Sequence, residues 1–270
     1  MIDSLLDVRD LHTHFRVPHS NPFAKKQWLR AVDGVSFQLS KGEVLSLVGE
    51  SGCGKTTVGR TLTRLEQAAS GSAVFDGTDI LALSQKQFRP IRRDIQMIFQ
   101  DPFASLNPRL TIEQILREPL FIHKLASSNA QAREMIEIML EKVGLDRSVV
   151  SRYPHEFSGG QRQRIGIARV MIVKPKLVVA DEAVSALDVS IQAQVLNLLK
   201  QLQRDSGIAM LFISHDLAVV RHISDRIAVM YQGKIVETAE KRTLFDTPQH
   251  AYTQRLLASI PRIPSIRQVS

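Results

Sequence analysis

Cysteine is nearly absent from this chain, since Cys53 is the only one among 270 residues. A single thiol excludes an internal disulfide, and it excludes a zinc or iron–sulfur site built only from cysteines of this chain. Aromatic residues are also scarce at 6%. No basic tract is interleaved with aromatic side chains, as a groove for single-stranded nucleic acid would require. We therefore expect no nucleic-acid partner.

Long apolar runs are missing as well. No stretch approaches the roughly 18 consecutive apolar residues that a membrane-spanning helix needs. Residues 1–8 include acidic side chains and lack the basic start and apolar run of a secretory signal. With 44% hydrophobic residues the chain can still bury a substantial core. We expect a globular protein that stays in the cytoplasm and does not cross a bilayer by itself.

The net charge is positive, at +8 with an isoelectric point near 9.8. This balance would suit nucleic acid, anionic lipid headgroups or an anionic ligand. The basic residues are spread along the whole chain, however, and solvated surfaces account for most of them. Charge alone therefore does not select a partner.

Strands and helices alternate along the sequence. Residues 43–48 predict a short buried strand and 57–65 a helix, while 177–180 and 210–213 are apolar runs too short for helices. Such runs suit the middle of a sheet that is covered on both faces. The region from about 85 to 153 indicates helices and gives no strong strand signal. The other expected elements are helices at 129–143, 162–173 and 190–204, and a hairpin of 227–231 with 234–237.

The strongest motif lies between the first of these strands and the helix after it. Its residues are Gly49-Glu50-Ser51-Gly52-Cys53-Gly54-Lys55-Thr56, which match G-x-x-x-x-G-K-[ST], and Thr57 follows. Glycines let backbone N–H groups wrap phosphates, and the helix N-terminus adds a positive dipole end. Lys55 would reach the outer phosphates and Thr56 would offer a hydroxyl to Mg²⁺. The sequence thus predicts a site for a nucleoside triphosphate, with Cys53 contributing only its backbone.

Two adjacent carboxylates, Asp181 and Glu182, end the apolar run at 177–180. In a parallel sheet, ligands gather at the carboxyl ends of the strands. Asp181 would then hold Mg²⁺, and Glu182 could accept a proton from an attacking water. Taken alone, such a pair would more simply be a helix cap or turn.

A second anion-binding segment follows Phe157 at the start of a predicted helix: Ser158-Gly159-Gly160-Gln161. One loop already cradles the phosphates of a bound nucleotide, so a second such segment needs an explanation. By itself it could equally be an ordinary helix entry.

These motifs together resemble the ATP-binding cassette ATPases. In that family a Ser-Gly-Gly-Gln signature faces the γ-phosphate held by a partner subunit, which implies a head-to-tail dimer with two shared ATP sites. Other motifs of the family fall in the same order here. Gln100 resembles the glutamine that senses the nucleotide and its Mg²⁺, residues 185–188 resemble the D-loop, and His215 resembles the switch histidine. The match covers nearly the whole chain.

The resemblance also implies a ring that stacks on adenine just after the first strand. Phe15 lies at that place, and Trp28 is the alternative, although a core role would suit either ring. The basic, proline-containing stretch at 16–30 lies between them. It reads either as a surface loop or as a lip over the nucleotide.

Several segments are similar to one subfamily, the oligopeptide, dipeptide and nickel importers. They are residues 99–102, 105–109 and 188–194, together with the tail at 250–257 and 260–261. The resemblance implies an α/β fold: a P-loop NTPase core with a mixed β-sheet, an inserted α-helical subdomain at about 85–155, and an N-terminal antiparallel β region. Within a domain of residues 1–270, the importer tail would begin at about 238.

As implied by that resemblance, the function is ATP binding and hydrolysis that energise bacterial uptake of peptides. Nickel, glutathione or an opine are alternative solutes, and an ABC ATPase outside transport is a further alternative. The implied partners are a second ABC ATPase, expected to be a different chain, two transmembrane permease subunits and an extracytoplasmic binding protein. The chain would lie peripherally on the cytoplasmic face of the inner membrane. Its cofactors would be ATP and Mg²⁺.

Phe157 and Ala183 depart from the usual leucine and proline of the family, and neither change removes a reacting group.

Overall fold

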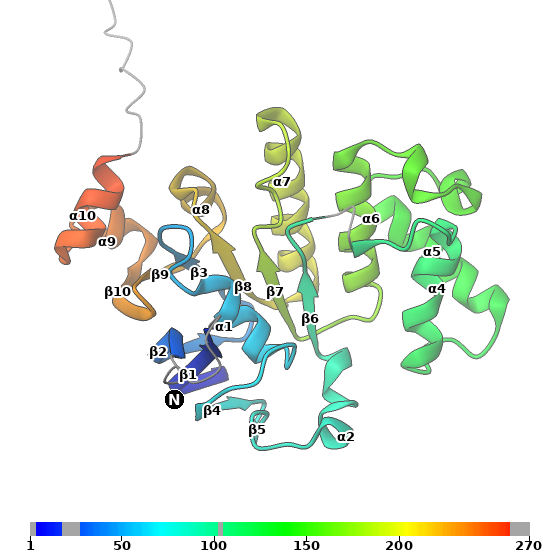
Figure 1. Ribbon diagram of the computed structural model, residues 1–270. Coiled ribbons are helices and arrows are strands. Elements are labelled where there is room, and N and C mark those ends of the chain that lie inside the picture. Colours follow the sequence, from blue (N-terminus) through cyan, green and yellow to red (C-terminus); the bar gives the residue numbers. More distant parts are fainter. Residues whose placement is uncertain (1–3, 18–27, 102–104, 260–270) are drawn as a thin grey trace, which may run out of the picture.

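A computed structural model describes residues 4–17, 28–101 and 105–259, and two sheets organise this part of the chain. The larger sheet has the strand order β10-β9-β3-β8-β7-β6 (Figure 1). Its inner strands pair in parallel, and only β10 joins its neighbour antiparallel. Its strands are β3 (Val44–Val48), β6 (Ile95–Ile98), β7 (Leu177–Asp181), β8 (Ala209–Ser214), β9 (Arg226–Tyr231) and β10 (Lys234–Glu240). Buried apolar residues fill β3, β7 and β8, as parallel strands covered on both faces require.

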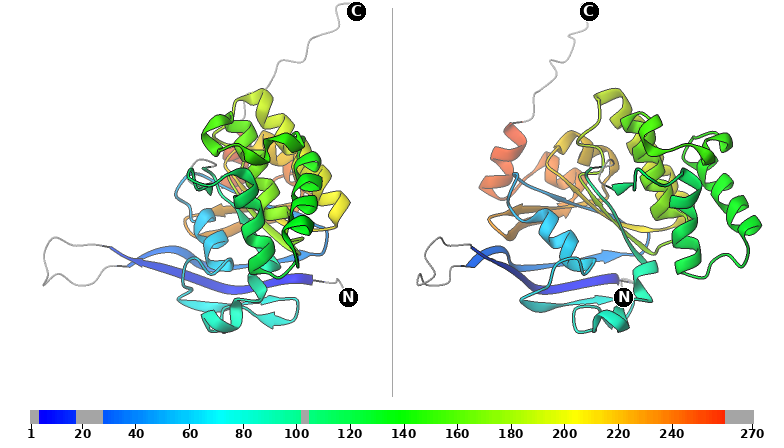
Figure 2. Two further views of the ribbon diagram at one scale, coloured as in Figure 1. Left: turned by 90° about the vertical axis from the view of Figure 1, so that its right-hand side faces the viewer. Right: turned by 45° about the vertical axis from the view of Figure 1, so that its right-hand side comes forward.

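The smaller sheet is antiparallel, with the order β2-β1-β4-β5. Its strands are β1 (Ser4–Arg16), β2 (Trp28–Ser40), β4 (Ser70–Phe75) and β5 (Thr78–Asp79). Helix α1 (Lys55–Leu62) lies between the two sheets, as Figure 2 shows, and touches β7 and β8 on one side and β1 and β2 on the other. The antiparallel sheet is thereby packed against α1, with the Thr13 and Thr61 hydroxyl oxygens 3.0 Å apart.

Helix α2 lies beside β5, and its Phe88 packs in the cluster that includes α1 and the antiparallel sheet; most of the remaining helices lie on the other face of the larger sheet and at its two ends. Figure 1 shows α4, α5 and α6 beyond β6, and α9 and α10 at the opposite end. Their bounds are α2 (Gln85–Phe88), α4 (Ile112–Ile122), α5 (Asn129–Lys142), α6 (Gly159–Met171), α7 (Val189–Ser206), α8 (Leu217–Ile223), α9 (Lys241–Asp246) and α10 (Ala251–Ala258), with short 3₁₀ helices η1 (Ile91–Arg93), η2 (Arg147–Ser151) and η3 (Pro154–Glu156). None of the described helices combines the length and apolar composition that crossing a bilayer requires.

The core divides into two clusters, one on each face of the larger sheet. Alternate residues of a strand point to opposite faces, so Val44 and Val48 of β3 join the cluster beneath α6 and α7. Leu45 and Leu47 of the same strand join the cluster that includes α1 and the antiparallel sheet. The sheet is therefore fixed from both sides, and its strand ends have defined positions.

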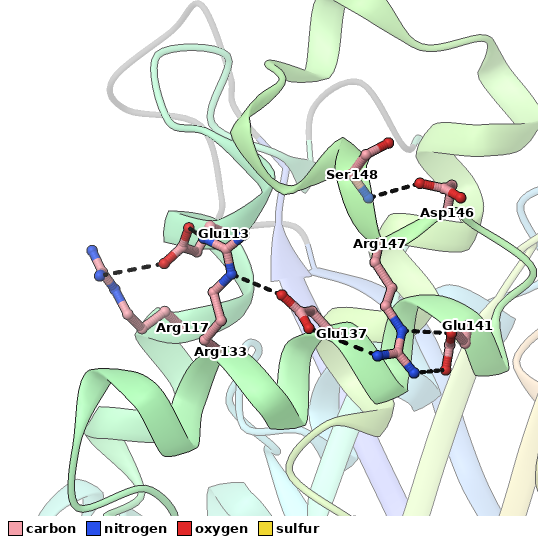
Figure 3. Close-up of polar contacts among 8 residues, drawn as sticks. All are labelled: Glu113, Arg117, Arg133, Glu137, Glu141, Asp146, Arg147 and Ser148. Carbon is pink, nitrogen blue, oxygen red and sulfur yellow. Dashed lines mark hydrogen bonds and ion pairs between the residues drawn. The ribbon is translucent and has the colours of Figure 1, made fainter.

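Arginines and glutamates connect α4, α5 and η2 on the outside of the molecule (Figure 3). Arg133 lies 3.1 Å from Glu113 of α4 and 2.9 Å from Glu137 of its own helix. Arg147 makes a two-pronged pair with Glu141, with nitrogen–oxygen distances of 2.5 and 2.8 Å. Apolar residues of α4, α5 and α6 pack beneath this network, so the helices form one block.

The predicted fold class is confirmed: a mixed α/β core, an antiparallel N-terminal sheet and a helical block. One prediction within it was wrong. The range 85–153 gave no strand signal, yet β6 occupies residues 95–98 and pairs in parallel with β7. Four residues that include a glutamine are too few for a sequence pattern, and the strand forms because β7 offers it an edge. Residues 18–27 of the basic stretch and 260–270 of the tail lie outside the described residues.

Candidate functional site

The loop at 49–56 leaves β3 and enters α1 at Lys55, in the strand–loop–helix context that the motif requires. Two of its glycines are needed for close packing. A Cβ atom on Gly49 would overlap the carbonyl oxygen of Met230, and one on Gly54 would overlap that of Ala31. Both also have positive φ angles, 152° and 106°. The loop is therefore held between β9 and β2, with its backbone free to follow a phosphate chain.

Lys55 lies across this loop and is only 4% exposed. Its Nζ donates to the carbonyl oxygens of Gly49 and Glu50, each at 2.8 Å, and lies 3.6 Å from Cys53 Sγ. The ammonium group is thus fixed inside the loop, where the outer phosphates of a nucleotide would lie. Cys53 is buried, and its carbonyl accepts from Gly233 N at 3.1 Å.

Thr56 and Asp181 meet at the carboxyl end of the sheet. The Thr56 hydroxyl donates to Asp181 Oδ1 at 2.9 Å. Burial raises the pKa of the Asp181 carboxyl, and this effect exceeds the opposing effect of the Thr56 hydrogen bond. A hydroxyl and a carboxylate are oxygen donors of the kind that Mg²⁺ prefers, so these two residues fit the predicted metal ligands.

Glu182 contacts the other two residues that were predicted to be catalytic, Gln100 and His215. Its Oε2 accepts from Gln100 Nε2 at 2.9 Å, and its Oε1 lies 3.0 Å from His215 Nδ1. The backbone of Glu182 has a positive φ of 46°, which is strained for a residue with a side chain and is often found at functional positions. Gln100 follows β6, Glu182 follows β7 and His215 follows β8, so neighbouring strands deliver all three to one edge.

The segment at 158–161 lies elsewhere. Ser158 caps α6: its hydroxyl accepts from Gln161 N at 3.3 Å, and Gln161 Oε1 accepts from Ser158 N at 3.0 Å. A Cβ atom on Gly160 would overlap Ile191 of α7, while Gly159 lies near Leu187. Figure 1 shows α6 on the far side of β6 and β7 from α1. The chain therefore does not bring this segment onto its own phosphate-binding loop.

The two aromatic candidates for adenine lie near the outer end of the antiparallel sheet. Phe15 of β1 pairs with Leu29 of β2 and is partly exposed. Trp28 pairs with Arg16 and is 57% exposed. Ala31, two residues beyond Leu29, touches the loop at Gly54. Both rings are thus carried by the strand pair that contacts the loop, and the geometry does not choose between them.

Two residues that the sequence did not single out support the site. The hydroxyl of Tyr252, on α10, accepts from Glu50 N in the loop at 3.1 Å, and the centroid of its ring lies 4.2 Å from the centroid of the Tyr231 ring. Gln163 of α6 is 2% exposed and donates to the carbonyl oxygen of Ala183 at 2.6 Å. Tyr252 lies in the tail segment that carries the importer resemblance, which was the available signal. Gln163 offered none, since a buried glutamine in a helix has no local pattern.

This arrangement can bind a triphosphate and hydrolyse it. The loop and Lys55 provide donors for phosphate oxygens, Thr56 and Asp181 provide oxygens for a cation, and Glu182 provides a base held by hydrogen bonds on either side. Fold and site together define a nucleoside-triphosphate hydrolase of the phosphate-binding-loop class.

Comparison with known families agrees with this class. Residues 32–185 match the family model of the ABC transporter, and residues 236–269 match that of the oligopeptide/dipeptide transporter C-terminal region. The chain is 54% identical over 261 residues to the oligopeptide transport ATP-binding protein AppF of Bacillus subtilis, covering 96% of this chain and 79% of that protein. It is 50% identical over 264 residues to the oligopeptide transport ATP-binding protein OppF of Escherichia coli, covering 95% and 78%.

Among solved structures, the chain is similar to the dimeric ATP-binding cassette MJ0796 in a post-hydrolysis state, bound to ADP and Pi. The TM-score is 0.78 at 26% identity, over 88% of this chain and 99% of that one. The chain belongs to the ABC transporter family. It is accordingly an ATP-binding cassette subunit, of the family that couples ATP hydrolysis to transport.

Proposed function

We propose that this chain is the ATPase subunit of a bacterial importer that takes up peptides, working as a translocase on the cytoplasmic face of the inner membrane. The observation that supports peptide uptake is the C-terminal region at 236–269, which matches the oligopeptide/dipeptide transporter model. The relatives named for oligopeptide transport match across almost the whole chain, and not only in the nucleotide-binding core.

In this proposal the residues around the loop divide the chemistry among them. The loop and Lys55 hold the phosphates, with Thr57 and the N-terminus of α1 behind them. Thr56, Asp181 and Gln100 would hold Mg²⁺, which would supply positive charge against the charge that develops on the phosphates. Glu182 takes the proton of the attacking water, and His215 orients Glu182 through its 3.0 Å contact. Phe15 stacks on the adenine.

The separation of Ser158–Gln161 from the loop supports a dimer. A capped helix N-terminus with two glycines is suited to an anion, and the phosphate-binding loop of the same chain lies across β6 and β7 from it. A second cassette placed head to tail would bring its nucleotide to this segment. We propose that the second cassette is a different chain, and that the complex includes two permease subunits and an extracytoplasmic binding protein.

Uptake of labelled peptides tests the proposal. A strain that lacks the gene should lose uptake and regain it with the wild-type chain, but not with Glu182→Gln. Glu134→Gln, on the exposed face of α5, is the matched control and should restore uptake. Normal peptide uptake in the deletion strain, with loss of another solute, would contradict peptide import while leaving the ATPase assignment intact.

Glutathione is a second candidate solute. The chain is 52% identical over 259 residues to the glutathione import ATP-binding protein GsiA of Salmonella paratyphi A, although it covers only 41% of that longer protein. Labelled glutathione in the same deletion strain distinguishes the two candidates, because only one solute should lose its uptake.

Subunit composition is tested separately. Purification of the membrane complex through a tag on this chain, followed by native mass measurement, should show one copy of this chain and one of a second cassette. A single cassette species at twofold stoichiometry would refute the heterodimer.

A further inference from the structure

A group of metal-ligating side chains lies outside the nucleotide site, on the antiparallel sheet. His12, His14 and Asp33 each offer one ligand atom, and these atoms all lie within 4.8 Å of one another. His12 of β1 is paired directly with Asp33 of β2. Leu11 and Thr13 are buried, and Thr13 contacts Thr61 of α1. The β1–β2 register shifts beside each histidine, between Leu11 and His12 and between Thr13 and His14, but both histidines are partly exposed and their rings are in contact, so they lie on one side of the strand pair.

His12 is oriented by carboxylates on both ring nitrogens. Its Nδ1 lies 3.3 Å from Asp33 Oδ1, and its Nε2 lies 3.1 Å from Asp10 Oδ1. A metal-bound histidine usually donates its second nitrogen to a carboxylate, which fixes the ring and raises its basicity. In a tetrahedral site with bonds of about 2.0–2.1 Å, neighbouring ligand atoms lie about 3.3 Å apart. The His12–Asp33 distance already has this value.

His14 supplies an independent observation. Its Nε2 atom is buried and has no hydrogen-bond partner among the residues that the structure describes. A buried polar atom without a partner costs free energy, and such atoms in native proteins need an explanation. The His14 ring meets the His12 ring edge to face, with the centroids 5.9 Å apart. An ion bound at His14 Nε2 would give this nitrogen the partner it lacks.

Two cations also approach Asp33, and they do not block the site. Lys234 Nζ lies 3.5 Å from Oδ2, the oxygen that does not face His12, and Arg30 Nη1 lies 3.7 Å from Oδ1. Their side chains are 62% and 67% exposed. Exposed pairs of this kind contribute little and rearrange easily. Arg30 can therefore leave Oδ1, and Lys234 can keep Oδ2.

We propose that His12, His14 and Asp33 bind one divalent transition-metal ion of the Zn²⁺ type, with Asp10 supporting His12 and a water in the fourth position. Two imidazoles and one carboxylate suit Zn²⁺ and its first-row neighbours, whereas Mg²⁺ and Ca²⁺ prefer oxygen ligands throughout. The ion would cross-link β1 to β2 one residue from Phe15. The inference does not depend on peptide import.

Zn²⁺ titration of the full chain against a chromogenic chelator tests this site. The protein is purified with a tag free of histidine and treated with EDTA. We expect the His12→Asn/His14→Asn double variant and Asp33→Asn, which remove proposed ligands, to bind one Zn²⁺ per chain more than about 100-fold more weakly than the wild type. Asp10→Asn, which removes only the support behind His12, should weaken binding by about 10- to 100-fold.

Two controls separate this site from others. His222→Asn, on α8, should bind as the wild type does. His215 and Glu182 lie 3.0 Å apart and could also take up Zn²⁺. His215→Asn removes that pair, so this variant should still bind the ion held by His12, His14 and Asp33. All variants are melted in EDTA to confirm that they fold. On adding Zn²⁺, the wild type and the two control variants should gain thermal stability, whereas the double variant and Asp33→Asn should not. Equal Zn²⁺ binding by wild type and the double variant, or no Zn²⁺ bound by the wild type, overturns the proposal.

Discussion

At the scale of single residues, Glu182 is the centre of the candidate site because it contacts both Gln100 and His215. An amide at this position keeps an oxygen that accepts and has a similar size, but it cannot take a proton from water. We expect Glu182→Gln to lower ATP turnover by about 10²- to 10⁴-fold while ATP still binds. Phosphate release and binding of a fluorescent ATP analogue measure the two properties.

Steady turnover in this variant at the wild-type rate would remove Glu182 from its assigned role. Glu134→Gln is again the control, since its side chain lies far from the loop on the exposed face of α5. It should leave both measurements unchanged.

Asp181 offers a test in which stability and function move in opposite directions. Burial raises the pKa of its carboxyl, so the folded protein keeps the proton to higher pH than the unfolded chain does. The free energy of unfolding therefore falls as pH rises from the unfolded pKa, about 3.9, through the raised folded value. Asn cannot ionise, and its oxygen can still accept from Thr56. Above that window, without nucleotide or metal, Asp181→Asn should melt a few degrees higher, since about 1 kcal/mol shifts Tm by roughly 2–4 °C in a domain of this size.

The same variant should lose Mg²⁺-dependent ATP hydrolysis. Asp205→Asn, at an exposed position of α7, is the control for removing a carboxylate and should change neither property. A lower melting temperature for Asp181→Asn in metal-free buffer would contradict the assigned cost of burial.

At the scale of elements, Tyr252 links α10 to the phosphate-binding loop through a single hydrogen bond. Removing its hydroxyl leaves Glu50 N without this partner, which costs about 0.5–1.5 kcal/mol. If the loop carries that cost, Tyr252→Phe should bind ATP up to about tenfold more weakly. Tyr231→Phe is the matched control, because that ring packs against Tyr252 but its hydroxyl bonds to Gln232 and not to the loop. Equal affinities for the two variants would show that α10 does not influence the loop.

The ion pairs in Figure 3 are expected to matter less than their number suggests. Arg133 is 48% exposed, and exposed pairs contribute little. Arg133→Ala should lower the melting temperature by no more than about 3 °C at low salt, and by less in 1 M NaCl, where screening acts over about 3 Å. Arg242→Ala, whose single pair is 92% exposed at the arginine, should cause no change. A larger loss that persists in high salt would assign Arg133 a packing role.

The accuracy of the sequence predictions differed between elements for physical reasons. Strands β3, β7 and β8 were found within one or two residues, because parallel strands buried on both faces are continuous apolar runs. Helix α5, predicted at 129–143, occupies Asn129–Lys142. Strand β6 escaped prediction because its existence depends on the edge of β7, which no local pattern reveals.

The candidate site also contains residues that local motifs predict and contacts that depend on the complete fold. The loop and the Asp181–Glu182 pair follow from local motifs, and the structure brings Thr56 and Asp181 into contact. The contact between Glu182 and His215 joins residues 33 positions apart and depends on the order of strands β7 and β8. Tyr252 is 202 positions from Glu50, and only the complete fold places it against the loop.

At the scale of the whole molecule, Ser158 lies away from the loop that would bind this chain's own ATP. A change at Ser158 can therefore separate binding of that ATP from the proposed contact with the partner's nucleotide. We expect Ser158→Arg to block hydrolysis of the nucleotide held by the partner cassette, because bulk and charge would fill the space before α6. The chain's own ATP should bind as before, since that segment lies away from its loop. Photolabelling with an azido-ATP, read out chain by chain in the purified complex, distinguishes the two sites.

Ser128→Arg is the control, because the Ser128 side chain also caps a helix, accepting from Gln131 N at the start of α5 as Ser158 accepts from Gln161 N at the start of α6. It removes a helix cap without approaching the proposed shared site and should leave both nucleotides hydrolysed. Loss of this chain's own ATP in Ser158→Arg would contradict the head-to-tail arrangement.

The hydrogen bond of Gln163 has a consequence for how two nucleotides would affect each other's binding in a dimer of cassettes. This bond to Ala183 ties α6, which begins at the segment proposed to meet the partner's nucleotide, to the residue directly after Glu182. A displacement of α6 that one nucleotide favours would then reach, through this bond, Glu182, the proposed base for the other nucleotide. Linkage requires that the effect be reciprocal: each nucleotide changes the affinity for its neighbour by the same factor. In a complex of unlike cassettes the two sites can differ widely in turnover, but that factor, measured by binding at either site, must be one and the same number.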